Sequence, residues 1–375
     1  MSVPIPLPPE YASLGPAELD RRIRAAKAAL GERLIILGHH YQRDEIIRYA
    51  DFTGDSLKLS QQAAAQSRAE FIVFCGVHFM AESADVLSGG SRPVILPDLS
   101  AGCPMAEMAD ADDLQTALDE VSALADGCRV VPVTYVNSTA AAKAITGRAG
   151  GACCTSSNCR AAFEWAQASG GRVKILAVPD QHLARATALD MGYGLDDCAL
   201  YRSRLPGGGL TAEQVRRATF ILWDGWCCVH QEFTVEQIAR RRGEYPGIRV
   251  IVHPECDIAV VQAADLHGST EQIIHAVADG APGSQWAVGT EINLVRRLSR
   301  LHTDRRVVNL TERGGRCATM ARIDLPHLCW VLDNLLAGTV VNRVDVPAAI
   351  RRDALSALER MVSLKGADGA STTRH

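Results

Sequence analysis

The chain of 375 residues has little of what marks proteins that bind nucleic acids or span membranes. Its formal net charge is −4 and aromatic residues make up only 5% of it, so we expect neither a basic surface nor a stacking platform for nucleic acid. It has no run of about 18 or more uncharged apolar residues, and we expect no membrane partner. The opening residues, MSVPIPLPPEYASLG, lack the charged and apolar regions of a secretory signal, which predicts a cytoplasmic protein with reduced thiols.

Cysteine, by contrast, is abundant. Hydrophobic residues at 47% and charged residues at 22% are typical of a globular protein, and the length suits two or three domains. In a reducing compartment, numerous thiols ligate metals, act in catalysis or pack in the core. No CxxC pair with zinc-finger spacing occurs, which argues against a structural zinc site. The twelve cysteines are Cys75, Cys103, Cys128, Cys153, Cys154, Cys159, Cys198, Cys227, Cys228, Cys256, Cys317 and Cys329.

The sequence repeats one plan three times. In each copy, a short run rich in Ile, Val and Leu is typical of a buried strand and ends in two polar residues that are two positions apart. The runs are RLIILGHHYQ, RVVPVTYVNS and IRVIVHPECD, and the polar pairs are His39 with Tyr41, Tyr135 with Asn137, and His253 with Glu255. Hydroxyl residues then open a helical pattern in each copy, as expected for N-cap or first-turn positions: Ser56, Ser156, Ser157, Ser269 and Thr270.

Two further strands follow in each copy, and the last one leads into a loop with cysteine. These loops carry Cys103, the pair Cys227 and Cys228, and Cys317. The distance from the leading polar residue to the cysteine is 64 residues in the first and third copies and 92 in the second. We attribute the extra length of the middle copy to an insertion around the Gly-rich segment YRSRLPGGGLTAE.

Strands that alternate with helices predict parallel α/β sheets. We therefore expect three pseudo-symmetric three-layer αβα domains with short parallel sheets around a central cluster site, because ligands of such sheets bind beyond the carboxyl ends of the strands. The predicted boundaries are an N-terminal arm at 1–20, a first repeat with its linking helix at 21–126, a second repeat at 127–246, a third at 247–318, and C-terminal helices with a frayed tail at 319–375.

The loop cysteines point to a metal centre. Three thiolates and one vacant position suit zinc or an iron–sulfur cluster with one exposed iron. The loop of the second repeat offers two candidates for the second ligand position, Cys227 and Cys228. Cys75, Cys128, Cys198, Cys256 and Cys329 lie outside the repeated loops, and we interpret them as packing residues.

Acid–base and anion-binding groups lie near these loops. His39, His230 and His253 follow strand or loop ends rather than lying within an apolar run, and imidazole can transfer protons near neutral pH. Helix starts carry N–H groups and a positive dipole end, so the hydroxyl clusters are candidate sites for phosphate or carboxylate.

The sequence resembles the quinolinate synthase A family, iron–sulfur enzymes of NAD biosynthesis. The resemblance extends from about residue 36 to 325. It is carried in order by GHHYQ, ADFTGDSLKLS, FCGVHFMAESA, PDLSAGCPMAE, TYVNST, CCTSSN, PDQHL, WDGWCCVH, HPECD, GST, VGTEINLV and CATM. It implies three pseudo-symmetric α/β domains and a [4Fe–4S] cluster with three Cys ligands and one open iron. It also implies condensation of iminoaspartate with dihydroxyacetone phosphate to quinolinate, with loss of phosphate and two waters.

The resemblance also assigns roles to residues. The implied cluster ligands are Cys103, Cys227 and Cys317, with Cys228 a bystander because the family pattern places the ligand two residues after the glycine. The catalytic candidates for proton transfer are Tyr41, Glu255 and His230. The substrate-binding candidates are His39, Ser56, Tyr135, Asn137, Ser156, His253, Ser269 and Thr270. The pathway of the family further implies L-aspartate oxidase as a functional partner that supplies iminoaspartate.

Two other functions fit parts of the pattern. Another open-site [4Fe–4S] hydro-lyase acting on a small polycarboxylate would use the same thiolates and anion sites without a phosphorylated triose. A non-enzymatic iron–sulfur or zinc regulator would need a basic stripe or a recognition element, and neither is apparent in the sequence.

Overall fold

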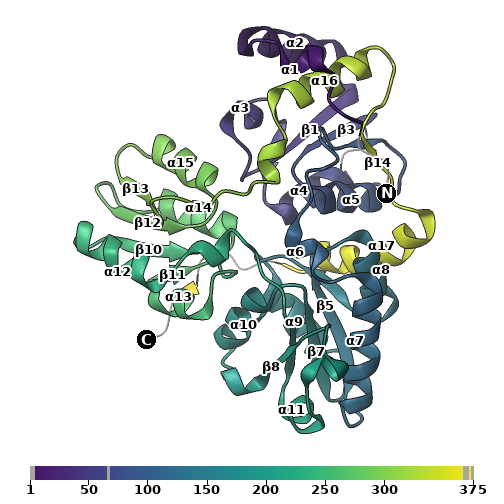
Figure 1. The fold of residues 1–375 in the computed structure, drawn as a ribbon, viewed down its shortest axis with the longest axis vertical. Helices are drawn as coiled ribbons and strands as arrows, with labels where there is room; N and C mark the ends of the chain where they lie inside the picture. The colour runs from purple at the N-terminus through teal and green to yellow at the C-terminus, as the bar shows by residue number, and fades with distance from the viewer. Residues whose placement is uncertain (1–4, 66–67, 366–370, 373–375) are drawn as a thin grey trace. The chain divides into compact units, whose positions relative to one another are not determined.

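The computed structural model describes residues 5–65, 68–365 and 371–372 (Figure 1). The chain divides into two compact units. Unit 1 comprises Met1–Cys103 and Cys317–Arg352, and unit 2 comprises Pro104–Arg316 and Asp353–His375. The boundary near residue 352 falls within helix α17 (Ala348–Ser363). The domain limits expected from the sequence stay predictions.

Three five-stranded sheets form the framework, one in unit 1 and two in unit 2. The sheet of unit 1 has the order β14 (Arg343–Val344), β4 (Val94–Ile95), β3 (Phe71–Cys75), β1 (Leu34–His39), β2 (Phe52–Gly54). The second sheet has the order β8 (Cys198–Tyr201), β9 (Phe220–Trp223), β7 (Val173–Val178), β5 (Arg129–Tyr135), β6 (Ala152–Cys154). The third has the order β13 (Arg306–Asn309), β12 (Gln285–Gly289), β10 (Arg249–Val252), β11 (Leu266–His267), β15 (Ser371–Thr372).

Four parallel strands occur in the same spatial order in every sheet. The third, second and first strands of each repeat lie side by side, and a short strand pairs with the other edge of the first. The α/β class and the three parallel-dominated sheets predicted from the sequence are therefore confirmed.

The short strands β2, β6 and β11 were not expected from the sequence. Each pairs with the carboxyl end of its first strand, as in the matches His39↔Gly54, Tyr135↔Cys154 and Val252↔His267. In each repeat, the hydroxyl residue named in the sequence analysis (Ser56, Ser156 or Ser269) follows two positions after the short strand. The register thus places each hydroxyl cluster next to the polar pair of its own repeat.

The fifth strand differs between the sheets. β14 is antiparallel to β4, β15 is antiparallel to β11, and β8 is parallel to β9. β8 belongs to the insertion of the middle repeat, together with η2 (Leu195–Asp197), η3 (Pro206–Gly209) and α11 (Ala212–Arg217).

Helices cover both faces of the sheets in unit 2. In Figure 1, α7 (Ala111–Leu124) and α8 (Ala140–Arg148) lie on one side of the second sheet, and α9 (Cys159–Gln167) and α10 (Gln181–Asp190) lie on the other. The third sheet lies between α14 (Thr270–Ala278) with α15 (Ile292–Leu301) and α12 (Val235–Glu244) with α13 (Ile258–Ala263). The remaining helices of unit 2 are α6 (Pro104–Glu107) and η4 (His230–Glu232).

The helices of unit 1 join the two ends of its discontinuous chain. α2 (Pro16–Leu30) packs against α16 (Leu325–Leu336), and Arg22 of α2 is ion-paired with Asp333 of α16. The other helices are α1 (Pro9–Ala12), η1 (Gly31–Arg33), α3 (Asp44–Ile47), α4 (Ser56–Ala65), α5 (His78–Leu87) and η5 (Met320–Arg322).

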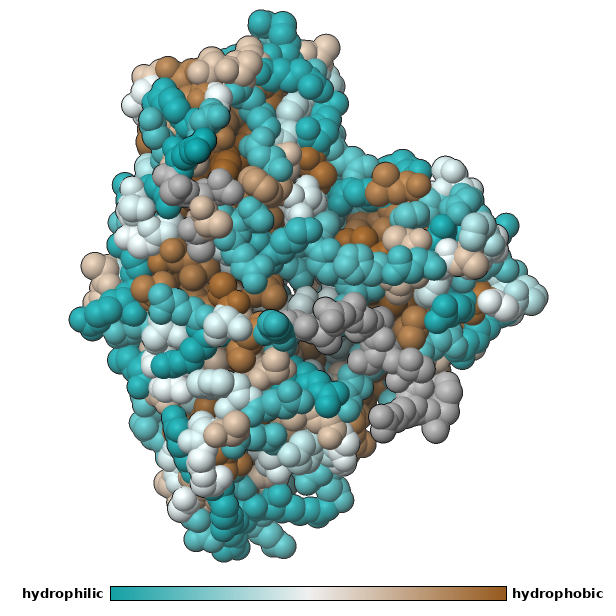
Figure 2. Space-filling model, turned by 180° about the vertical axis from the view of Figure 1, so that it is seen from behind, coloured by the Kyte–Doolittle hydropathy of each residue, from teal (hydrophilic) through white to brown (hydrophobic). Residues whose placement is uncertain are grey.

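The first strand of unit 1, β1, is buried at all six positions, whereas edge strands such as β8 are only partly buried. Hydrophilic side chains predominate on the face drawn in Figure 2. Within the described residues, no helix has the length and hydrophobicity needed to cross a bilayer.

Candidate active site

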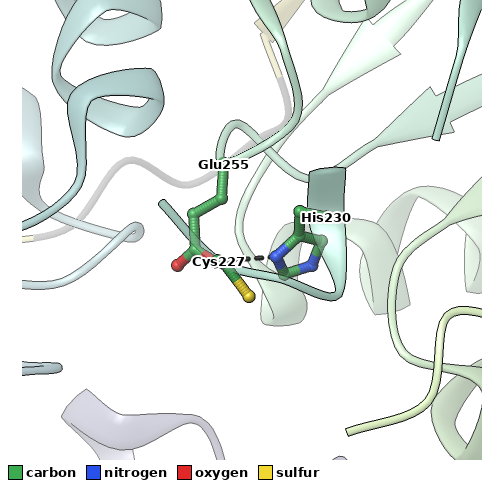
Figure 3. A group of neighbouring side chains, drawn as sticks. All are labelled: Cys227, His230 and Glu255. Carbon is green, nitrogen blue, oxygen red and sulfur yellow. Dashed lines mark hydrogen bonds and ion pairs between the residues drawn. The ribbon is translucent and has the colours of Figure 1, made fainter. Parts of the chain in front are cut away.

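In unit 2, the segments that follow two strands bring Cys227, His230 and Glu255 together (Figure 3). Cys227 and His230 follow β9, whereas Glu255 follows β10 of the other sheet. One potential ligand atom from each residue lies within 4.8 Å of the others. This is the one such cluster of His, Cys, Asp or Glu within the described residues, and sulfur, nitrogen and carboxylate oxygen are all common metal ligands.

His230 is held from both sides of its ring. Its Nδ1 lies 2.7 Å from Glu255 Oε2, and its Nε2 lies 3.2 Å from the hydroxyl of Thr290. The ring stacks on that of His253 with centroids 4.4 Å apart. His230 is 1% exposed, and His253 and Glu255 are each 2% exposed. The position of this imidazole is therefore fixed by two hydrogen bonds and one ring contact in a dry environment.

The electrostatic environment gives the neighbouring groups different charges. Burial raises the pKa of Glu255, but His253, His230 and hydrogen bonds from His230 and Tyr135 outweigh this and lower it to about 2. Burial and the nearby His230 lower the pKa of His253 to about 3. Near neutral pH, Glu255 is therefore an ionised acceptor and His253 a neutral imidazole.

The tautomer of His253 follows from a backbone contact. The N–H of Glu255 donates to His253 Nδ1 at 3.3 Å, so the proton of the neutral ring is on Nε2. The same arrangement recurs in the first repeat, where the N–H of Tyr41 donates to His39 Nδ1 at 3.1 Å. The two repeats thus set their strand-end histidines in the same tautomer.

The polar residues after β5 and β11 occupy different kinds of turn. The amide oxygen of Asn137 is buried and has no hydrogen-bond partner among the described residues. Ser269 is the N-cap of α14 and accepts the N–H of Gln272 at 3.3 Å, and Thr270 is the first helical residue, as predicted. The prediction that Ser156 and Ser157 occupy N-cap or first-turn positions is wrong.

These two serines lie in a turn before the helix. Asn158 Oδ1 accepts the N–H of Thr155 at 2.7 Å and its hydroxyl at 3.1 Å, and α9 begins only at Cys159. Because this asparagine closes the turn, it delays the helix by three residues relative to Ser156.

In unit 1, side-chain bonds tie three candidate loops together. Arg322, five residues after Cys317, donates to Asp98 at 2.9 Å and to Ser100 at 2.7 Å in the loop that leads to Cys103. Gln42, next to Tyr41, donates to the carbonyl oxygen of Met320 at 2.9 Å. These hydrogen bonds therefore join three loops of unit 1: the loop with His39 and Tyr41, the loop with Cys103 and the loop with Cys317. Helix α4 begins at Ser56, close to the first of them.

The cysteines fall into two chemical groups. Burial raises the pKa of Cys75, Cys153 and Cys329 to about 12 and that of Cys198 to about 11, and it raises the pKa of Cys256 well above the usual value. A hydrogen bond with Cys159, and then burial, raises the pKa of Cys154. These thiols are poor ligands because a metal binds the thiolate. Cys103, Cys227 and Cys317 are instead partly exposed on loops, and Cys228 is exposed.

Three buried residues of the site region were missed by sequence reasoning: Thr290, Asp180 and His182. Thr290 follows β12 and contacts His230, whereas Asp180 and His182 follow β7. A usable signal was present, because all three lie in GTE and PDQH segments just after the second strand of their repeats.

Comparison with known proteins gives consistent matches. A family model described as "Quinolinate synthetase A protein" matches residues 21–363. The chain is 54% identical over 353 residues to a protein of Nocardioides sp. named quinolinate synthase, which covers 93% of this chain and 90% of the relative. It is 50% identical to proteins of the same name from Streptomyces coelicolor (95% of this chain, 91% of the relative) and Geobacillus kaustophilus (96% of each).

Proposed function

The chain belongs to the quinolinate synthetase A family, and on this premise we propose that it condenses iminoaspartate with dihydroxyacetone phosphate to form quinolinate, releasing phosphate and two waters. The observation that carries the proposal is the group of Cys227, His230 and Glu255, in which a partly exposed thiol lies next to a buried, hydrogen-bonded acid–base pair. A condensation followed by dehydrations needs such proton transfers at positions screened from water.

We propose that Cys103, Cys227 and Cys317 ligate a [4Fe–4S] cluster. The donor set fits, since these three are partly exposed loop cysteines while six others are thiols with raised pKa. With one iron left open, the cluster would supply a Lewis acid for the loss of hydroxide during dehydration.

Glu255, His230 and Tyr41 are the proposed proton-transfer residues. Glu255 is ionised and hydrogen-bonded to His230, so a proton taken up by the imidazole at Nε2 is stabilised by the carboxylate on Nδ1. Thr290 holds Nε2 and defines where that proton lies before transfer. Tyr41 extends from the equivalent position of the first repeat.

Substrate binding is assigned to the remaining strand-end and helix-start residues. His39, Tyr135, Asn137 and His253 would orient the carbon skeleton by hydrogen bonds, and the unsatisfied amide oxygen of Asn137 is suited to a substrate N–H or O–H. Carboxylates and phosphate would bind at the hydroxyl clusters: Ser56, Ser269 and Thr270 at helix N-termini, which favour anions, and Ser156 in the turn before α9. We further propose that the protein works in the cytoplasm on iminoaspartate supplied by L-aspartate oxidase.

Anaerobic purification with iron and sulfide analysis, followed by a quinolinate assay with the two substrates, tests the proposal. We expect about four irons and four sulfides per chain, and loss of both cluster and product in Cys103→Ser, Cys227→Ser and Cys317→Ser. Cys228→Ser is the matched control and should retain both. A full cluster in any of the three ligand variants, or no quinolinate from the cluster-loaded wild type, would contradict the assignment.

A further inference from the structure

The turn after β7 packs tightly against the loop that carries Cys227. The N–H of Gln181 donates to the carbonyl oxygen of Gly225 at 3.0 Å, and its side-chain amide donates to Asp224 at 2.9 Å. A Cβ atom on Gly225 would lie 2.3 Å from the carbonyl oxygen of Pro179. The two backbones are therefore in contact, and only glycine fits at this point of the second loop.

Asp180 lies at the centre of this contact. It is 2% exposed, and its Oδ1 accepts the N–H of Leu183 at 2.7 Å as the N-cap of α10. Burial and then the nearby Glu255 raise the pKa of its carboxyl group well above the usual value, although backbone N–H groups that face it, including that of Cys227, oppose this rise. Oδ2 is buried and has no hydrogen-bond partner of normal geometry within the described residues.

A helix cap alone does not account for this residue. Asn, Ser and Thr cap helices about as well as Asp and bring no charge into a buried place. A buried carboxyl group with one unsatisfied oxygen is costly, so its presence requires another contribution. Outside the β7–α10 turn, two groups act on this carboxyl group: the nearby Glu255 and the N–H of Cys227, which is the proposed second cluster ligand.

We infer that Asp180 is a positioning residue for Cys227, fixing the backbone of this cysteine so that its sulfur is directed to the cluster. The inference rests on the proposed function, because it takes Cys227 to be a cluster ligand. Asp180 links the N-terminus of α10 to the backbone of Cys227. Residues that contact a metal ligand without binding the metal commonly orient that ligand in this way. Asp180 contacts no substrate in this scheme and transfers no proton.

The test compares iron release from the cluster-loaded protein to a chelator under anaerobic conditions. Asp180→Asn keeps the size and the helix cap but replaces an acceptor by an N–H₂ group that faces the Cys227 N–H. We expect iron release about tenfold faster than in the wild type, with an altered electron paramagnetic resonance spectrum of the reduced cluster. The melting temperature of the cluster-free full-length chain should stay that of the wild type.

Asp110→Asn is the matched control, since Asp110 caps α7 through the N–H groups of Asp112 and Asp113 and lies on an exposed turn. It should leave both iron release and the spectrum unchanged. Asp180→Ser keeps a capping oxygen in a smaller side chain and answers the question if the Asn variant does not fold. Wild-type release rates and spectra in the folded Asp180 variants would overturn the inference.

The outcomes separate this inference from the proposed function. A wild-type chain without iron, or a full cluster in Cys227→Ser, would refute the proposed function. A different result would refute only the role of Asp180: the wild type holds a normal cluster, Cys227→Ser loses it, and Asp180→Asn releases iron and gives a spectrum as the wild type does.

Discussion

Acidification should destabilise unit 2 through two buried histidines. Burial, and then the charge of Arg185, lower the pKa of His182 to about 4, and its Nδ1 is buried without a hydrogen-bond partner in the described residues. His253 has a pKa lowered to about 3. Below the ordinary histidine pKa of about 6.5, the unfolded chain binds protons at both positions and the folded chain does not. Stability therefore rises with pH over this range, and it is lost as the pH falls from 6.5 toward the folded values.

The magnitude follows from proton linkage. Each proton taken up on unfolding changes the free energy of unfolding by about 1.4 kcal/mol per pH unit. Between pH 6.5 and 5.0, His182 and His253 should each contribute about 2 kcal/mol, or about 4 kcal/mol together. His182→Gln removes one titrating group and should lower the slope by about 1.4 kcal/mol per pH unit, whatever it does to absolute stability.

Urea unfolding of the cluster-free chain at several pH values measures this slope. Tryptophan fluorescence can follow unit 2, because Trp223 and Trp286 are 2% and 1% exposed in its two sheets. His275→Gln, at an exposed position of α14, is the control and should leave the slope unchanged. Equal slopes in the wild type and His182→Gln would refute the reasoning, since His182 would then bind its proton equally well in both states.

Three further predictions concern the active site. Glu255→Gln removes the carboxylate that stabilises a protonated His230, and kcat for quinolinate formation should fall by about 10²–10⁴ with little change in KM; an unchanged kcat would exclude proton transfer through this pair. Thr290→Val removes the hydroxyl 3.2 Å from His230 Nε2. It should lower the free energy of unfolding by about 1 kcal/mol and shift the pH profile of kcat. An unchanged pH profile would argue against a positioning role for Thr290. Alkylation of Cys228, which is exposed, should proceed equally fast with and without the cluster, whereas cluster loading should protect Cys227; protection of Cys228 would reverse the ligand assignment.

The sequence was informative about the strands of each repeat because they are continuous apolar runs. β1, β5 and β10 were expected from such runs, and each lies where its run predicted. β2, β6 and β11 have two or three residues, too few for any periodicity to appear. β14 and β15 are equally short and pair with strands distant in sequence, so only tertiary packing determines them.

The active site was predictable residue by residue but not contact by contact. His230 and Glu255 could be selected as candidates because each is a titratable residue next to a strand end. Their hydrogen bond joins loops of two different sheets, and the sequence alone does not indicate how close two such loops lie. Asp180 was overlooked because its contact with Cys227 is made through a backbone N–H, which every residue except proline possesses.

The discontinuity of unit 1 has a consequence for synthesis on the ribosome. The sheet built on β1 is completed by β14, and α2 needs α16 as its packing partner, so the first hundred residues cannot finish folding until residues 317–352 have been translated. At about 5–20 residues per second, the intervening chain takes on the order of 10–40 s to make. During that time the nascent N-terminal segment exposes the apolar face of α2, which makes it a natural client for chaperones that act at the ribosomal exit.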